Sequence, residues 1–228
     1  MINLKGISSM ATRLVLAELA EAFQRRSGHI VSIESVGGVD AAKRVQGGEA
    51  FDVVILASDV IDKLIVSGHL LAGGKVDLAR SGVAIAVRQG APKPDIATEE
   101  ALRRAVLSAR SLSYSTGPSG AALAALFERW GVLEEIKGRI VQPAPGTPVG
   151  SLIARGDVEL GFQQLSELIH LEGITILGPM PPTAPIITTF SGGICAASQQ
   201  GDAVRAMLEF MASPEAAAAK LRQGMEPA

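Results

Sequence analysis

Cysteine and aromatic residues are scarce in this chain. Cys195 is the only cysteine among 228 residues, which excludes an internal disulfide and a metal site built from several thiolates. Aromatic side chains make up 4% of the residues, too few for a platform on which bases or sugars would stack. Cys195 itself follows a strand-like run, so we interpret it as a small buried apolar side chain.

An excess of one charge sign is also lacking. The chain has 21 Lys and Arg against 23 Asp and Glu, a net charge of -2, and the basic residues are scattered. This distribution argues against a nucleic-acid partner. His29, His69 and His170 are isolated and have no neighbours at metal-ligand spacing, so neither a metal nor a cofactor is expected.

Long apolar runs are absent. No stretch is long enough to span a bilayer, and the N-terminus lacks the basic end and apolar run of a signal peptide. We expect a chain that is not membrane-embedded, and a cytoplasmic one if the sequence is the full gene product and no export signal was removed. A hydrophobic content of 47% with 19% charged residues is typical of a globular protein with a sizeable core.

Short apolar segments alternate with amphipathic ones in the first third of the chain. Residues 52–56 are almost wholly apolar and β-branched, which is typical of a parallel strand buried on both faces. The alternation indicates βαβ crossovers and a parallel sheet covered on both sides. The expected elements are strands at residues 2–7, 30–34, 52–56 and 82–88, and helices at 10–24, 38–46 and 58–67.

The rest of the chain repeats this rhythm. Two proline-rich connections, residues 89–94 and 178–185, are stiff and suit crossings between lobes. They predict lobe one at residues 1–87 plus 188–228 and an inserted lobe two at 88–187. The expected elements are strands near residues 112–114, 138–142, 158–163, 174–177, 186–190 and 193–197, and helices at 98–109, 121–130, 149–155, 166–170, 202–211 and 214–222.

Hydroxyl and glycine residues stand where several strands turn into helices. The first turn of a helix presents unpaired N–H groups and the positive end of its dipole, so these junctions suit an anion. In parallel sheets they meet at the carboxyl ends of the strands, where ligands bind. The alternative is that the serines only cap their helices. The junction residues are Ser8, Ser9, Gly37, Gly38, Ser115, Thr116 and Ser119.

Three further polar residues follow predicted strands. Gln163 and Gln164 end one strand, and because burying an unpaired amide costs on the order of a few kcal/mol, we expect them to face the ligand cleft. Asp59 opens a helix and either caps it or acts on a ligand. Neither a hydrolase triad nor the lysine of a phosphate-binding P-loop is visible.

Four segments form an ordered pattern along the chain. They are the first strand with its serines and the helix that ends at Phe23 and Gly28, residues 48–55, residues 115–120, and residues 157–162. In this order they resemble the molybdate-binding branch of the type 2 periplasmic solute-binding proteins, over nearly the whole length.

The resemblance implies an α/β fold of two lobes, each a mainly parallel sheet flanked by helices, with a ligand cleft between the lobes that closes by hinge motion. It also implies a monomer in the periplasm, serving the permease of an ABC importer. In this family the anion is bound by hydroxyl and backbone N–H groups without neutralisation by charged side chains. By position, the contacts fall on Ser8 or Ser9, on Gly37 and Gly38, and on Ser119, Val149 and Gln164.

Three positions depart from the family pattern. The second loop has glycine where the family has serine, Gln164 replaces a tyrosine, and Ser115 stands where asparagine is usual. Glycine permits close backbone approach, and glutamine both donates and accepts hydrogen bonds. Such a site suits a small carboxylate as well as a tetrahedral oxyanion.

Residues 161–167, Gly-Phe-Gln-Gln-Leu-Ser-Glu, are similar to members of this branch related to aconitate isomerase. The first hypothesis is a binding protein for a small oxyanion or carboxylate, with no catalytic residue. The alternative is an isomerase that moves a double bond in an unsaturated polycarboxylate, for which Asp59 is the nearest candidate base by sequence. A cytosolic sensor of the same anion stays open as a third hypothesis.

Overall fold

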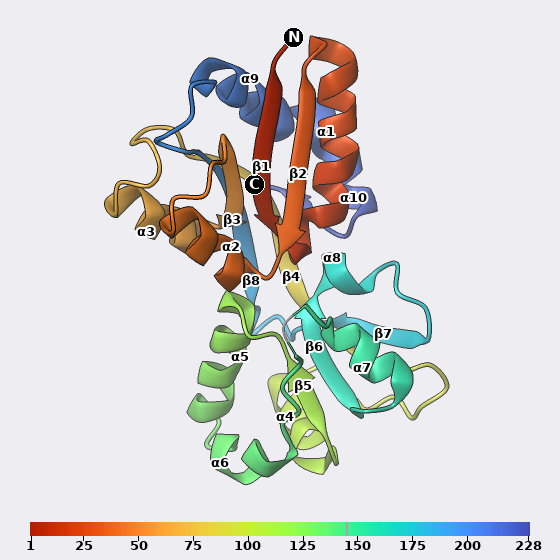
Figure 1. Cartoon of the computed structure of the whole chain (residues 1–228). Helices are drawn as coiled ribbons and strands as arrows, with labels where there is room; N and C mark the ends of the chain where they lie inside the picture. The colour runs from red at the N-terminus through yellow and green to blue at the C-terminus, as the bar shows by residue number, and fades with distance from the viewer. Residues whose placement is uncertain (145) are drawn as a thin grey trace. The chain divides into compact units, whose positions relative to one another are not determined.

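The chain folds into two compact units, each with its own sheet and helices (Figure 1). The structure is a computed structural model that describes residues 1–144 and 146–228. Unit 1 consists of Met1–Ser81 and Thr188–Ala228, and unit 2 of Gly82–Ile187. The chain leaves unit 1 within strand β4 and returns within strand β8, so unit 2 is an insertion.

Both crossings lie inside long strands and not in the proline-rich segments. Residues 89–94 and 178–185 belong to unit 2. Strand β4 (Val76–Arg88) begins six residues before the predicted start, because Asp77, Arg80 and Ser81 hide its apolar pattern. The Asp77 carboxylate accepts a 2.5 Å hydrogen bond from Ser191 of the neighbouring strand.

Strand β8 (Ile187–Ile194) corrects a second boundary, since the sequence predicted two strands there. The gap between the two predicted strands covered Ser191 and Gly192, and Gly193 began the second one. In the structure both glycines are paired in the sheet, and a Cβ atom on them would lie 2.3 Å from Leu208 and 2.7 Å from Leu70. These glycines therefore allow close packing and do not mark a turn.

Unit 1 contains a sheet in the order β2-β1-β3-β8-β4, with β9 also paired to β4. Strands β1, β2 and β3 are parallel, as predicted, while β8 runs antiparallel to β3. The remaining elements of this unit are β1 (Asn3–Ser9), η1 (Met10–Thr12), α1 (Arg13–Ser27), β2 (Ile30–Val36), α2 (Gly38–Gln46), β3 (Val53–Ala57), α3 (Ser58–Val66), α9 (Gly201–Ala212), η3 (Pro214–Ala216), α10 (Ala217–Arg222) and β9 (Glu226–Pro227).

Strand β3 is buried on both faces, as its apolar run predicted. Successive side chains of a strand point to opposite faces. Val53 and Ile55 accordingly pack into a core with helices α1, α9 and α10, whereas Val54 and Leu56 pack with α2 and α3. The sheet of unit 1 is thus covered by helices on both sides.

Unit 2 contains strands in the order β5-β6-β4-β7. Of these four strands, β5 and β6 pair parallel, whereas β4 pairs antiparallel with both β6 and β7. The prediction of a mainly parallel sheet is therefore wrong for this lobe. The remaining elements are α4 (Glu99–Ser108), β5 (Leu112–Tyr114), α5 (Pro118–Arg129), α6 (Leu133–Ile136), η2 (Lys137–Arg139), α7 (Val149–Arg155), β6 (Leu160–Gln164), α8 (Leu165–Leu168) and β7 (Ile174–Pro179).

The sheet of unit 2 also has a core on each face. One core joins alternate residues of β4 and β6 to helices α4, α5 and α6, and the other joins β4 to α7 and α8. The strand predicted at residues 138–142 is absent: Ile140 makes a single bridge to Leu112, following the 3-10 turn η2. Pro145, in the predicted rigid turn, lies outside the described residues.

Among the described helices, none combines the length and the apolar character needed to cross a bilayer.

Candidate functional site

The carboxyl ends of three parallel strands meet at one edge of unit 1. In the register of the sheet, Ser9 of β1 lies opposite Val36 of β2, and Ser8 lies opposite Ile55 of β3. Each strand passes directly into a helical segment, so three helical N-termini gather at this edge. This is the arrangement in which α/β sheets bind anions.

Ser8 and Ser9 occupy different environments at this edge. Ser8 is fully buried, and its hydroxyl lies 2.8 Å from the Ser35 hydroxyl and donates to the Ser9 carbonyl at 3.3 Å. The Ser9 hydroxyl has only a 3.5 Å contact, with the Thr12 hydroxyl. Ser9 is the N-cap residue of η1, as the capping interpretation had it, but its hydroxyl makes no capping hydrogen bond. Of the two, Ser9 has the hydroxyl with bonding capacity left for a ligand.

Gly37 and Gly38 form the turn into helix α2. Gly37 is the N-cap residue and Gly38 is the first helical residue. A Cβ atom on Gly38 would lie 3.7 Å from the Ser9 Cβ atom and 3.9 Å from Leu56. The first turn of α2 therefore lies beside Ser9, and the Asp40 carboxylate of the same turn would be 3.3 Å from a Cβ atom on Gly37.

Asp59 lies in the first turn of α3 but does not cap it. The N-cap residue is Ala57, which makes no side-chain cap, and the exposed Asp59 carboxylate pairs with Lys63 at 3.3 Å. An exposed carboxylate held in an ordinary helix pair lacks the environment that makes a catalytic base. Asp59 is therefore not the cap of α3, and its action on a ligand stays a prediction.

Arg13 is a cation that the sequence interpretation overlooked. It is the exposed first residue of α1, four positions after Ser9, and no ion pair or hydrogen bond of its side chain appears within the described residues. The signal was available in the sequence, because a basic residue at a helix N-terminus opposes the helix dipole. Its place suits an anionic ligand.

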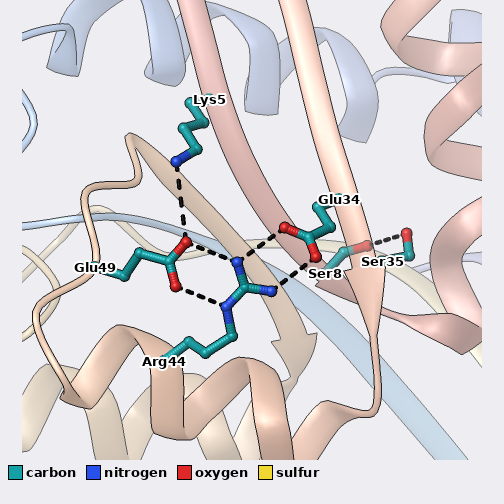
Figure 2. Close-up of polar contacts among 6 residues, drawn as sticks. All are labelled: Lys5, Ser8, Glu34, Ser35, Arg44 and Glu49. Atoms are coloured by element: carbon teal, nitrogen blue, oxygen red, sulfur yellow. Dashed lines mark hydrogen bonds and ion pairs between the residues drawn. The ribbon is translucent and has the colours of Figure 1, made fainter. Parts of the chain in front are cut away.

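An ion-pair cluster fastens α2 to the sheet (Figure 2). Arg44 donates two hydrogen bonds to Glu34 at 2.8 and 2.9 Å and two to Glu49, both at 2.7 Å. Lys5 lies 3.9 Å from Glu49. These bonds raise the pKa of Arg44 and lower the pKa values of Glu34 and Glu49. Because its charge is matched twice, Arg44 acts as a fastener for the helix and not as an anion ligand.

Unit 2 has a comparable edge, where the parallel strands β5 and β6 end. The Ser115 hydroxyl lies 3.0 Å from that of Ser119. Ser119 is the second residue of α5, whose N-cap is Gly117, so its interpretation as the N-cap is wrong by two positions. A Cβ atom on Gly120 would lie 1.6 Å from the Ser115 carbonyl oxygen, so only glycine fits there. Thr116 is exposed in the same turn.

Gln163 links two segments at this edge. Its Oε1 atom accepts a hydrogen bond from the Gly150 amide at 3.0 Å, and its Nε2 atom donates to Glu167 Oε1 at 2.8 Å. Gln163 therefore holds Glu167 in place. Val149, the first residue of α7, is buried in the core, and Gln164 is the buried last residue of β6.

Glu167 is the second functional candidate that the sequence interpretation missed. It is half-buried on α8, and burial raises its pKa to about 7 against the lowering effect of the Gln163 hydrogen bond. The signal in the sequence was its spacing, four residues after Gln163 in the quoted Gly161–Glu167 run.

Cys195 lies away from these edges, where its amide donates a hydrogen bond to the Asp52 carbonyl just before β3. Cys195 is buried, and burial together with the nearby Asp52 carboxylate raises the pKa of its thiol to about 12, as suits an inert apolar residue. In the described part of the chain, no group of three or more acidic, histidine or cysteine side chains is placed to hold a metal ion.

A separate hollow of about 360 Å³ lies at the opposite end of the unit 2 sheet. It is bounded by the Pro92–Pro94 segment, by α4 and by Glu159 and Leu160 at the start of β6. Since β6 ends at Gln164, this hollow is at the amino end of the strand and does not include any of the predicted site residues.

Comparison with known proteins assigns the family. Residues 4–226 match the family described as bacterial extracellular solute-binding protein. The chain is 38% identical over 233 residues to an aconitate isomerase of a Pseudomonas species, an alignment that covers 99% of this chain and 88% of that protein. It is 26% identical over 162 residues to the molybdate-binding protein ModA of Azotobacter vinelandii, covering 67% of this chain and 61% of that protein.

Solved structures support the same fold. The periplasmic molybdate-binding protein of Azotobacter vinelandii superposes with a TM-score of 0.78 at 23% identity, covering 97% of this chain and 98% of that one. The sulfate-binding protein SubI of Mycobacterium tuberculosis gives a TM-score of 0.80 at 16% identity, with coverages of 100% and 87%. The chain therefore belongs to the family of bacterial extracellular solute-binding proteins, as its ordered motifs predicted.

Proposed function

We propose that this chain binds a small polycarboxylate anion through the strand ends of its sheets. The observation that carries the proposal is the gathering of three helical N-termini with Ser9, Gly37 and Gly38 at one edge of unit 1. Hydroxyl and amide donors at this edge replace the water around a carboxylate, and each charge-assisted hydrogen bond contributes on the order of 1.5–3 kcal/mol.

Arg13 adds a cation to the unit 1 edge, which suits an anion with several negative charges such as a polycarboxylate. The expectation from the resemblance was a site without charged side chains, yet Arg13 begins α1 and has no ion-pair partner in the part of the chain that the structure describes. A guanidinium matches the two oxygens of a carboxylate with two parallel hydrogen bonds. The same proposal includes ligand contacts at Ser115, Thr116, Ser119, Val149 and Gln164. It also includes a single ligand bound by both units, and closure of the units by a hinge motion.

The second candidate function is isomerisation of an unsaturated tricarboxylate. It is favoured by the 38% identity to an aconitate isomerase across 99% of the chain, and by Glu167. The two functions share the ligand class, because an isomerase must first bind the anion. A periplasmic location and an importer permease as partner belong to the first function only.

A thermal-shift screen tests the ligand class. A ligand that binds only the folded state raises the melting temperature, and the increase grows with the logarithm of the ligand concentration relative to its Kd. We expect trans-aconitate and cis-aconitate at millimolar concentration to raise it more than molybdate or sulfate do. A shift with molybdate alone would contradict the proposal.

NMR separates binding from isomerisation. The protein is incubated with trans-aconitate, and the vinyl proton signals of the trans and cis isomers are followed. Growth of the cis signals above those of a sample without protein establishes the second function. Binding without conversion leaves the first function alone.

A further inference from the structure

Glu167 combines three properties at the ligand edge of unit 2. It follows β6 on helix α8, at the edge where the neighbouring parallel strand β5 leads to Ser115 and Ser119. Its side chain keeps partial contact with solvent. One carboxylate oxygen is held by Gln163, and no hydrogen bond to the other oxygen appears within the described residues. A positioned carboxylate with a free oxygen can take up a proton.

We propose that Glu167 is the group that moves the proton when the chain isomerises an unsaturated tricarboxylate, and that Gln163 is its positioning residue. This inference rests on the isomerase function proposed above. Asp59, the earlier candidate, is exposed and paired with Lys63. Glu159, the other acidic residue near β6, lies at the amino end of the strand and accepts a hydrogen bond from the Arg110 amide at 2.7 Å.

The step balances without a second reactant. The Glu167 carboxylate takes a proton from the methylene carbon next to the double bond, and the electron pair of that C–H bond forms the new double bond. The electron pair of the old double bond moves to its far carbon. That carbon takes a proton from the Glu167 carboxyl group, which returns to its starting state.

The surroundings of Glu167 suit both halves of this step. A group that must accept and then donate a proton works best with a pKa near the working pH, and burial brings the pKa of Glu167 to about 7. Arg155, on the adjacent helix α7, pairs with Asp157 at 2.8 Å. Burial is the main cause of the raised pKa of Glu167, and the hydrogen bond from the Gln163 amide lowers it.

The main test replaces Glu167 with glutamine, which keeps the shape and removes the base. With trans-aconitate as the probe, we expect the conversion rate to fall at least about 100-fold. The affinity measured by calorimetry should stay within about threefold, because a neutral amide still fits the site. Glu172→Gln, an exposed acidic residue five positions on, is the matched control and should keep the full rate.

The positioning role has its own measurement. The Gln163 hydrogen bond lowers the pKa of Glu167, so Gln163→Met should raise it. The wild-type rate should increase with pH through about 7, and in this variant the rise should move to higher pH, with activity regained there. A merely structural role would lower the rate without moving the profile.

The outcomes separate the two proposals. An active wild type with an equally active Glu167→Gln variant overturns the role of Glu167 and leaves the isomerase standing. A wild type that binds trans-aconitate without converting it overturns the isomerase, and the role of Glu167 with it. If Glu167→Gln fails to fold, Glu167→Asp replaces it in the test. A Glu167→Asp variant with the wild-type conversion rate and an unchanged pH profile overturns the role of Glu167.

Discussion

At the scale of single residues, substitution of Arg13 tests whether the unit 1 edge binds a polycarboxylate. We expect Arg13→Gln to weaken trans-aconitate binding about tenfold, which is about 1.4 kcal/mol, since a charge-assisted pair is replaced by a neutral contact. The effect should shrink as salt is added, because the residue is exposed. Calorimetry at low and high ionic strength measures both. Arg103→Gln, an exposed residue of α4 in unit 2, should leave the affinity unchanged and serves as the control.

Lys220 is a buried cation that has no role in the proposed function. Lys220 lies in α10 and is 1% exposed, and its Nζ atom has no hydrogen-bond partner within the described residues. Burial lowers the pKa of Lys220. Burying the charged amine therefore lowers the free energy of unfolding. This loss is full below the folded-state pKa and disappears as pH rises past the ordinary value of 10.5.

Replacing this lysine with methionine should therefore stabilise the protein. We expect Lys220→Met to raise the free energy of unfolding by about 1–2 kcal/mol at neutral pH, with a smaller gain at pH 10. Urea denaturation at both pH values measures this. The control is Lys63→Met, at an exposed surface pair, which should change little. A loss of stability in Lys220→Met would contradict this explanation.

Single residues also mark what the sequence can and cannot reveal. Ser9, Gly38 and Ser119 were placed at strand ends from their order alone, because a strand followed by a helix fixes its turn at one edge of a sheet. Glu167 could not be identified in this way. Its properties depend on burial and on a hydrogen bond from Gln163, both of which require the packing of α8 against β6.

Helix α2 shows how one element depends on side chains far from its functional end. Arg44, near its C-terminus, is bonded to Glu34 on β2 and to Glu49 in the loop before β3. Both acids have a lowered pKa because of these bonds. Their contribution to stability is therefore present above the ordinary value of 4.5 and is lost as pH falls through the folded-state values.

The Arg44→Met variant tests this fastening. Methionine keeps an apolar stem beside Phe51 and removes the four hydrogen bonds, so the melting temperature should fall at pH 7. The difference from wild type should shrink below about pH 4, where both acids become protonated. Arg25→Met breaks an exposed pair with Glu21 in α1 and should have little effect at either pH. An equal loss at pH 3 and pH 7 would argue against the ion pairs as the cause.

At the scale of elements, the sequence was most informative where one pattern dominated. The apolar run of β3 and the amphipathic stripe of α1 predicted their elements, because a single burial pattern covers each one. Strand β4 was harder to predict, since its first part is half polar. The hydrogen-bond partner of its Asp77 is Ser191, which follows more than a hundred positions later in the chain. Pairing at that distance leaves no local signal.

The whole molecule is an insertion of one unit into another, and Ser9 and Ser119 belong to different units. The prediction that a single ligand is bound by both units therefore has a direct test. If it holds, Ser9→Ala and Ser119→Ala should each weaken binding of trans-aconitate, and the double variant should weaken it at least about tenfold, since each lost charge-assisted hydrogen bond contributes on the order of 1.5–3 kcal/mol. Calorimetry should give one ligand per chain throughout.

The controls for this test are serines of the same two units that lie outside the strand-end turns. Ser32→Ala changes an exposed residue of β2, and Ser108→Ala an exposed residue at the end of α4, so both should bind as the wild type does. An effect of Ser9→Ala alone would confine the ligand to unit 1. Because Ser119 then has no ligand to contact, that result would also separate the unit 2 edge from the binding site and count against the proposed role of Glu167.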